Sequence, residues 1–377
     1  MKVCIIRNAE AESNSDVIRS VDAFHNLNVE CMILTRSRSK TNYKNKIIQK
    51  KFKYKSKEIN NFEIQLYGEM DKGLKNLTQL FIYQYKVFLW LLKNKNEYDV
   101  IHAYDLDAGL PSILIKLLLR KKVVYHISDL FVDSRNGIPD ILKNLVRNVE
   151  YYIIKKANDT IICTEQRVEQ IKGSKPQRLH ILHNSPVECC RLERNLKMSN
   201  SEKIKIGYVG GLIDIRFIEE ILDVVSINEK IILEVGGIGP MANIVEEYSR
   251  RYKNIIYRGK LSYDEALKLY NGCDLMIAIY DPKIKNHKYS APNKVYEAMM
   301  LGKPIIVAKN TGVDMIVEKE EVGLAIEYCK NDFKKTLDNI LLEKNILNQL
   351  SKNSSEAYNK YSWENMILKY KEIYDSL

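Results

Sequence analysis

The strongest constraint on the fold is an alternation of short apolar runs with longer amphipathic segments, which continues through most of the 377 residues. A strand that is buried on both faces has a nearly continuous run of Val, Ile and Leu, whereas a helix covering a sheet has apolar residues three and four positions apart. Alternation of the two is typical of parallel strands joined by crossover helices. The pattern therefore predicts the α/β class, with doubly wound parallel sheets.

The alternation is interrupted once, which predicts two domains of similar size. In the first half we expect strands at Lys2–Ile6, Val29–Thr35, Val100–Ala103, Lys122–Ile127, Thr160–Cys163 and Leu179–Leu182, and helices at Asp16–Leu27, Asn76–Lys93, Gly109–Leu119 and Ile141–Lys156. Leu145, Val149 and Tyr152 would share one face of the last of these helices. The polar, aperiodic stretch 186–203 is then interpreted as a linker between a domain at 1–185 and one at 204–360.

The second half repeats the alternation. We expect strands at Ile204–Val209, Lys230–Gly236, Ile255–Tyr257, Leu275–Ile279 and Pro304–Ala308, and helices at Ile218–Val225, Met241–Arg250, Tyr263–Asn271 and Lys294–Leu301. The last segment, Asp332–Leu377, is polar and helical. Ligands of doubly wound sheets bind at the carboxyl ends of the strands, so the facing ends of the two domains are the expected site.

Composition excludes several classes of protein. Hydrophobic residues make up 45% and charged residues 28% of the chain, which is ordinary for a globular domain and excludes a disordered or collagen-like protein. The longest apolar run, Val87–Leu92, is far shorter than the ~18 residues that span a bilayer. The first residues lack the apolar core of a signal peptide, and the seven cysteines form no CxxC pair. We therefore expect a reduced, cytoplasmic protein without a metal centre.

The formal charge of +11 bears on partners and leaves nucleic acid, an anionic membrane and phosphorylated small molecules as alternatives. Ten Lys and Arg residues and no acid lie within Arg36–Lys57. This stretch is interpreted either as a solvated loop or as a membrane contact, because Phe52 and Tyr54 interleave with the lysines. Lys143–Lys156 is a second basic, amphipathic segment.

The segment 290–308 is the densest candidate site. Pro292 suits the first turn of a helix that Ser290 could cap, and Gly302 would end that helix. The N-terminus of such a helix attracts a phosphate, and Lys294 in the first turn would add a cation. Glu297 lies on the same face as Asn293 and Lys294 and could accept both hydroxyls of a ribose. The alternative is a structural helix with a Lys294–Glu297 pair.

Two glycine turns follow strands of the second domain. Gly210 and Gly211 would let backbone approach a ligand closely, and Arg216 could bind a diphosphate. Gly239 ends a second turn, Gly236–Gly239, which lacks the spacing of a dinucleotide fingerprint. The turns are weak indications singly and stronger together.

The first domain offers polar residues at the end of one strand. His126 and Ser128 share a face, and Asp129 follows, although a lone histidine is more often structural. Asp105 and Asp107 match a metal-binding DxD pattern by letter, but no third ligand is apparent nearby.

Taken together, these features resemble those of a retaining glycosyltransferase of family 4 with the two-domain GT-B fold. The resemblance covers nearly the whole length, and the block 292–307 is its most specific part. It is carried by Tyr98–Asp107, Val123–Phe131, Asn158–Glu165, His183–Ser185, Ile206–Arg216, Gly259–Leu261, Cys273–Ile277, Pro292–Val307 and Tyr361–Glu364. The resemblance implies that 361–377 forms a helix crossing back to the first domain.

The resemblance also implies a function for each domain. The second would hold a nucleotide diphosphate-sugar, with a UDP-sugar as the expected donor, and the first would hold a saccharide or lipid-linked acceptor; no metal, redox cofactor or nucleic acid is implied. Glu297 matches the second Glu of the family's E-x7-E motif, and Arg216 matches the basic residue on the diphosphate. Asn293, Lys294 and Val295 match the turn on the phosphate side. His126 joins Arg216 and Lys294 as a candidate catalytic residue.

Three positions depart from the family pattern. Tyr289 stands where the first Glu of the E-x7-E motif would be, Gly211 stands where an Arg is common, and Ser128 aligns with an expected His. A glycine pair near the N-terminus is also replaced, by Asn8–Asn14. These departures leave an alternative, a silent GT-B subunit that positions an active partner. A sugar-nucleotide epimerase on the same fold would need carboxylates that the sequence does not place.

Overall fold

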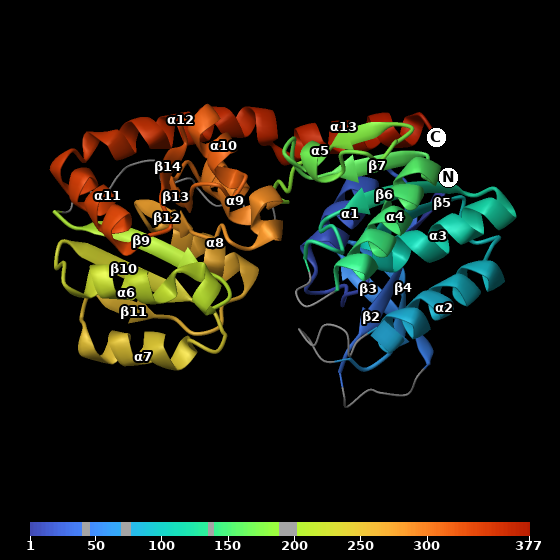
Figure 1. Cartoon of the computed structure of the whole chain (residues 1–377), viewed down its shortest axis with the longest axis horizontal. Helices are drawn as coiled ribbons and strands as arrows, with labels where there is room; N and C mark the ends of the chain where they lie inside the picture. The colour runs from blue at the N-terminus through green and yellow to red at the C-terminus, as the bar shows by residue number, and fades with distance from the viewer. Residues whose placement is uncertain (40–45, 69–76, 135–138, 188–201) are drawn as a thin grey trace. The chain divides into compact units, whose positions relative to one another are not determined.

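The computed structural model describes residues 1–39, 46–68, 77–134, 139–187 and 202–377. The chain separates into two compact units, Met1–His183 together with Met366–Leu377, and Asn184–Asn365 (Figure 1). Most of the expected linker, residues 188–201, lies outside the described part of the chain.

The first unit is built on an eight-stranded sheet in the order β3-β4-β2-β1-β5-β6-β7-β8. All neighbouring strands are parallel except β3 and β4. The strands are β1 (Lys2–Ile6), β2 (Glu30–Ser37), β3 (Ile47–Tyr54), β4 (Lys57–Gln65), β5 (Val100–Tyr104), β6 (Lys122–Ile127), β7 (Asp159–Ile162) and β8 (Leu179–Ile181). The helices are α1 (Ser15–Asn26), α2 (Leu77–Lys93), α3 (Asp105–Leu119), α4 (Asp140–Lys156) and α5 (Arg167–Gln170).

Part of the basic stretch Arg36–Lys57, for which a solvated loop was one of the two interpretations, is an antiparallel hairpin. In β3 one side of the strand packs inward, since Phe52 is 6% exposed and pairs with Ile59 of β4. Lys51 and Lys53 lie on the other, exposed side of β3, and Lys50 and Lys55 pair with Glu63 and Asp22. Residues 40–45 of the stretch lie outside the described residues.

The second unit has a six-stranded, fully parallel sheet in the order β11-β10-β9-β12-β13-β14. The strands are β9 (Ile204–Val209), β10 (Ile231–Gly236), β11 (Ile255–Tyr257), β12 (Leu275–Ala278), β13 (Ile305–Ala308) and β14 (Gly323–Ile326). The helices are η2 (Asp214–Arg216), α6 (Ile218–Ser226), α7 (Ala242–Arg251), α8 (Tyr263–Asn271), η3 (Lys285–Tyr289), α9 (Asn293–Leu301), α10 (Val313–Lys319), α11 (Lys330–Leu342) and α12 (Asn345–Tyr361). The sequence did not predict α10 and β14.

The last helix, α13 (Trp363–Asp375), extends into the first unit. Tyr370 and Tyr374 are buried there, and both rings contact Phe24 of α1 edge to face. Two doubly wound α/β units with a terminal helix that returns to the first confirm the predicted fold class. In the described part of the chain, no helix combines the length and the apolarity needed to cross a bilayer.

Candidate functional site

Two glycine turns of the second unit pack backbone on backbone at the carboxyl ends of β9 and β10. The Gly210 N–H donates to Gly236 O over 3.0 Å. A Cβ on Gly237 would lie 1.9 Å from Gly210 O, and one on Gly239 would lie 2.3 Å from Leu212 O. Because no side chain fits at Gly237 or Gly239, glycine at these positions allows the two turns to pack this closely.

The N-terminus of α9 lies beside the same turns. Its N-cap, Pro292, makes no side-chain capping bond, so the N–H groups of the first turn are not capped by it. Lys294 extends from this turn to Gly210, where a Cβ would lie 3.0 Å from Nζ, and its Nζ is 5.8 Å from the centre of the Tyr208 ring. The predicted cap was wrong, since Ser290 Oγ donates to Thr311 O, whereas Gly302 ends the helix as predicted with φ 64°.

Arg216 supplies a second cation. Its guanidinium lies 3.8 Å from the centre of the Tyr280 ring, and its Nη1 is buried without a hydrogen-bond partner. Within the described residues neither Arg216 nor Lys294 makes an ion pair. A buried donor without a partner is costly, so the geometry favours an anion beside these groups.

Glu297 is 6% exposed and lies at the inner end of this region. Burial, and next the Glu297 carboxylate, raises the pKa of the Tyr270 phenol. The neutral Tyr270 hydroxyl bonds both the N–H and the carbonyl of Val209, the last residue of β9. The carboxylate is therefore placed near the strand end that leads to Gly210.

The remaining predicted donor residues differ in what they can offer. Val295 is fully buried, so its side chain belongs to the core. Asn293 begins α9 and Tyr289 ends η3, and both are partly exposed. Gly211 has open space around its Cα, and its carbonyl accepts from the Tyr208 hydroxyl over 2.8 Å.

Sequence reasoning missed Tyr208 and Tyr280, the two rings beside the cations. Tyr208 could have been found, since it lies on the strand that leads into the turn, two residues before Gly210. Tyr280 could not, because its contact with Arg216 joins residues 64 positions apart.

In the first unit, Ser128 lies in a charged network at the ends of β1, β5 and β6. The Ser128 hydroxyl donates to Asp16, and its N–H and that of Asp129 donate to Asp105 over 2.8 and 3.1 Å. Arg7 pairs with both of these carboxylates. The network fixes the turn after β6, so the main chain of Ser128 is held in one place.

The two carboxylates of this network have opposite pKa shifts. Burial raises the pKa of Asp105 to about 6, although Arg7 opposes the shift. Burial would also raise the pKa of Asp16, but Arg7 and Arg19 hold it below its ordinary range. Asp16 therefore stays charged and is the firmer partner of Ser128.

The side chains of His126 and Asp129 already interact with other protein groups. His126 is buried, with Nδ1 3.1 Å from Nε2 of His102, which in turn bonds the Tyr374 hydroxyl. Burial, and next His102, holds the pKa of His126 well below its ordinary value. Asp129 pairs with the buried Arg167. These contacts favour the structural interpretation of His126.

The DxD residues are bound to protein groups. Asp105 has the partners given above, and Asp107 accepts from the Asn8 amide over 2.6 Å. Across the described ranges, no group of three or more His, Cys, Asp or Glu side chains is arranged to hold a metal ion.

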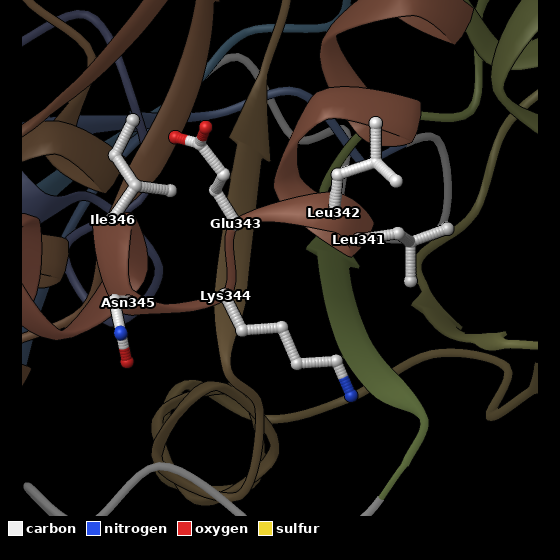
Figure 2. A pocket seen from close by; sticks show the side chains of 6 residues that line it. All are labelled: Leu341, Leu342, Glu343, Lys344, Asn345 and Ile346. Atoms are coloured by element: carbon white, nitrogen blue, oxygen red, sulfur yellow. The ribbon is translucent and has the colours of Figure 1, made fainter.

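A surface pocket of about 590 Å³ lies at the turn between α11 and α12 (Figure 2). It is lined by the continuous segment Leu341–Ile346. None of the candidate residues lines it, and the Lys344 ammonium bonds Glu202 O. We therefore assign it no part in the site.

Comparison with known proteins supports the resemblance. The family described as glycosyl transferases group 1 matches residues 192–357. An uncharacterised glycosyltransferase of Methanocaldococcus jannaschii is 22% identical over 289 residues, which are 74% of this chain and 76% of that protein.

Solved structures share the fold at low identity. Sucrose-phosphate synthase from Thermosynechococcus elongatus has a TM-score of 0.76 at 17% identity, covering 100% of this chain and 98% of that one. HepE of Anabaena in complex with UDP and glucose has a TM-score of 0.71 at 15% identity, covering both chains fully. These matches establish a GT-B fold.

Proposed function

We propose that the chain transfers a sugar from a UDP-sugar to a saccharide or lipid-linked acceptor with retention, because residues 192–357 match the family described as glycosyl transferases group 1 and the chain has the GT-B fold. The observation that carries the donor assignment is the pair Arg216 and Lys294, two cations without ion-pair partners in the described chain, beside glycine turns and a helix N-terminus. HepE, which shares the fold, binds UDP and UDP-glucose.

Each donor-side group has a distinct task in this proposal. The diphosphate lies between the α9 N-terminus, Lys294 and Arg216, and Glu297 accepts the ribose hydroxyls. The bond between the anomeric carbon and the diphosphate oxygen breaks while the acceptor oxygen bonds that carbon on the same face. The acceptor proton passes to the departing diphosphate. The protein contributes charge stabilisation and placement rather than a covalent nucleophile.

The acceptor and the pathway belong to the same proposal. We place the reaction in the cytoplasm, at the inner face of the plasma membrane, in the synthesis of a cell-surface polysaccharide or glycolipid. The basic character of the first unit supports an anionic membrane surface as a partner and not nucleic acid, since a lipid-linked acceptor requires the enzyme to reach the bilayer.

The silent subunit is the second candidate. It is favoured by Tyr289 at the position of the first Glu and by the bonds that already occupy Ser128 and Asp129. The test is release of UDP by the purified protein from a panel of UDP-sugars, with UDP binding measured in parallel. Turnover that is lost in the Arg216→Ala/Lys294→Ala double variant supports the transferase. UDP binding without any turnover, with and without saccharide acceptors, would favour the silent subunit.

A further inference from the structure

Three neighbouring helices of the first unit expose large apolar side chains. On α2, Phe81, Tyr85 and Leu89 follow one another at four-residue spacing and are 65%, 62% and 43% exposed. That spacing places them on one face of the helix, which points away from the core that Tyr83, Val87 and Leu91 enter.

The next two helices have the same property. Leu114, Leu117 and Leu118 of α3 and Ile141, Leu145 and Tyr152 of α4 are exposed. Of the three residues expected to share one face of α4, Val149 contacts the core, whereas Leu145 and Tyr152 are exposed. Nine of the eighteen large apolar side chains exposed in the described residues lie on these three helices, so they are concentrated rather than scattered.

The three helices form one surface. Helix α3 contacts both α2 and α4 and packs on β5 and β6. Figure 1 shows the three helices following one another along the sheet of the first unit. We call this surface the α2–α4 face, defined by the nine apolar side chains named above.

Cations lie at the C-terminal ends of the three helices of the α2–α4 face, and exposed acids are scarce on these helices. Helix α2 contains no acid, the two acids of α3 are bound to Arg7 and Asn8, and Glu150 of α4 is buried. Asp140 is the exposed acid of the three helices and pairs with Lys143. By contrast, Lys93, Arg120 and Lys155 are exposed and make no ion pair in the part of the chain that the structure describes.

We propose that the α2–α4 face binds the surface of an anionic lipid bilayer, with the nine apolar side chains at the level of the headgroups and the cations on the lipid phosphates. Apolar residues flanked by Lys and Arg are the composition that binds such an interface. A symmetric contact between two copies is less favourable, because it would bring the same cations together on both sides. This inference rests on the proposed function in one respect: a lipid-linked acceptor gives the contact its purpose.

The basic hairpin is a poorer candidate for the same contact. Phe52 is buried, the Tyr54 hydroxyl donates to Asp22, and Lys50 and Lys55 have acidic partners. The structure thus moves the expected membrane contact from Arg36–Lys57 to the outward side of the helices, including Lys143–Lys156.

The experiment is sedimentation of the full chain with phosphatidylcholine vesicles, with and without phosphatidylglycerol, at low and high salt. We expect binding to the anionic vesicles at low salt. The variant Phe81→Ser/Tyr85→Ser/Leu89→Ser should bind about tenfold or more weakly. Its control, Ile227→Ser/Met315→Ser/Leu342→Ser, alters apolar residues of the second unit that are 72%, 57% and 82% exposed, and it should bind as the unmodified protein does.

Charge-reversal variants test whether vesicle binding depends on the cations of the α2–α4 face or on the net charge of the protein. Lys93→Glu/Arg120→Glu/Lys155→Glu should lose roughly 100-fold or more of the binding at low salt. Lys230→Glu/Lys253→Glu/Lys319→Glu changes the net charge equally at exposed sites of the second unit and should lose much less.

Three outcomes would overturn the inference. The first is that the unmodified protein does not bind anionic vesicles at low salt. The second is that test and control variants lose vesicle binding equally. The third is that ultracentrifugation without lipid shows a dimer, which only the Phe81→Ser/Tyr85→Ser/Leu89→Ser variant dissociates. Circular dichroism and urea unfolding are measured on every variant and show that each is folded, because UDP binding would report only on the second unit. Vesicle binding without release of UDP from UDP-sugars would contradict the proposed function and leave the inference standing. Release of UDP without vesicle binding would contradict the inference and leave the proposed function standing.

Discussion

Arg216 and Lys294 combine two properties that a structural cation lacks. Each lies over an aromatic ring and makes no ion pair in the described chain, so each side chain is positioned while its charge is uncompensated. Stacking on Tyr280 orients the guanidinium without neutralising it. The same two residues are the ones that the sequence placed on the diphosphate.

Replacing either cation should affect the rate more than substrate binding. In Arg216→Ala and Lys294→Ala we expect kcat to fall more than KM rises, because negative charge on the leaving diphosphate grows in the transition state. Steady-state kinetics with the best UDP-sugar checks this. Changes confined to KM would make both residues uniform binders and remove the electrostatic argument.

Glu297 should matter for binding the nucleoside. Glu297→Ala removes a charged hydrogen-bond acceptor, a loss of roughly 1.5–3 kcal/mol, or about 10- to 150-fold in affinity for UDP. Calorimetric titration with UDP measures it, and Glu265→Ala, at an exposed helix start, is the control. Unchanged UDP affinity in a folded Glu297→Ala protein would remove this residue from the site.

Activity should not depend on a divalent metal. The Asp105 carboxylate is held by Arg7 and two N–H groups, and Asp107 is bonded to Asn8, so neither carboxylate is arranged as an open ligand. We expect UDP release to continue after treatment with EDTA. Complete inhibition that Mg²⁺ or Mn²⁺ reverses would restore these aspartates as candidate ligands.

The glycine turns join β9 and β10 to the candidate site, and Gly210 and Gly237 in these turns should respond differently to substitution. At Gly210 a Cβ would meet the flexible end of Lys294, whereas at Gly237 it would meet the Gly210 carbonyl, with φ at +143°. Gly210→Ala should therefore weaken UDP binding severalfold at little cost in stability. Gly237→Ala should destabilise the fold by roughly 1–3 kcal/mol. Urea unfolding and UDP titration together distinguish the two, and equal losses of stability would contradict the assignment.

The accuracy of the sequence predictions followed burial. Strands β1, β6 and β9 were predicted to the residue, because strands covered on both faces leave continuous apolar runs between polar ends. The β3–β4 hairpin was missed because one side is solvated and rich in lysine, so its alternation resembles a polar loop. In the site, Gly210 and Lys294 were predicted from local patterns, but the stacking of Arg216 on Tyr280 depends on tertiary packing that spacing does not reveal.

At the scale of the whole chain, the C-terminal residues complete the core of the first unit. Tyr374 bonds His102, and the Tyr370 hydroxyl lies 3.1 Å from Ser20 Oγ, so residues from both ends of the sequence share one buried polar cluster. Around it lie aromatic rings from α1, β5 and α13. The core of the first unit is therefore complete only with α13 in place.

This cluster should make the stability of the first unit sensitive to acid. Burial lowers the pKa of His102 to about 3, and burial and His102 lower that of His126. Below about pH 6.5 these two histidines bind protons in the unfolded chain but stay neutral in the folded protein. The free energy of unfolding should therefore fall by about 1.4 kcal/mol per pH unit for each histidine. Asp105, with its pKa raised to about 6, acts in the opposite direction as the pH falls from 6 towards 3.8.

The two histidines lower the stability more than the one aspartate raises it, so we expect a net loss of stability as the pH falls from 7 to 5. Urea unfolding at several pH values would measure this loss. His102→Asn should reduce the slope by about one proton, since it removes one of the groups that cannot be protonated in the folded state. His25→Asn, at a half-exposed histidine of α1, is the matched control and should leave more of the slope in place. A slope that His102→Asn leaves unchanged would mean that acid acts on the protein elsewhere than at the contact between β5 and α13.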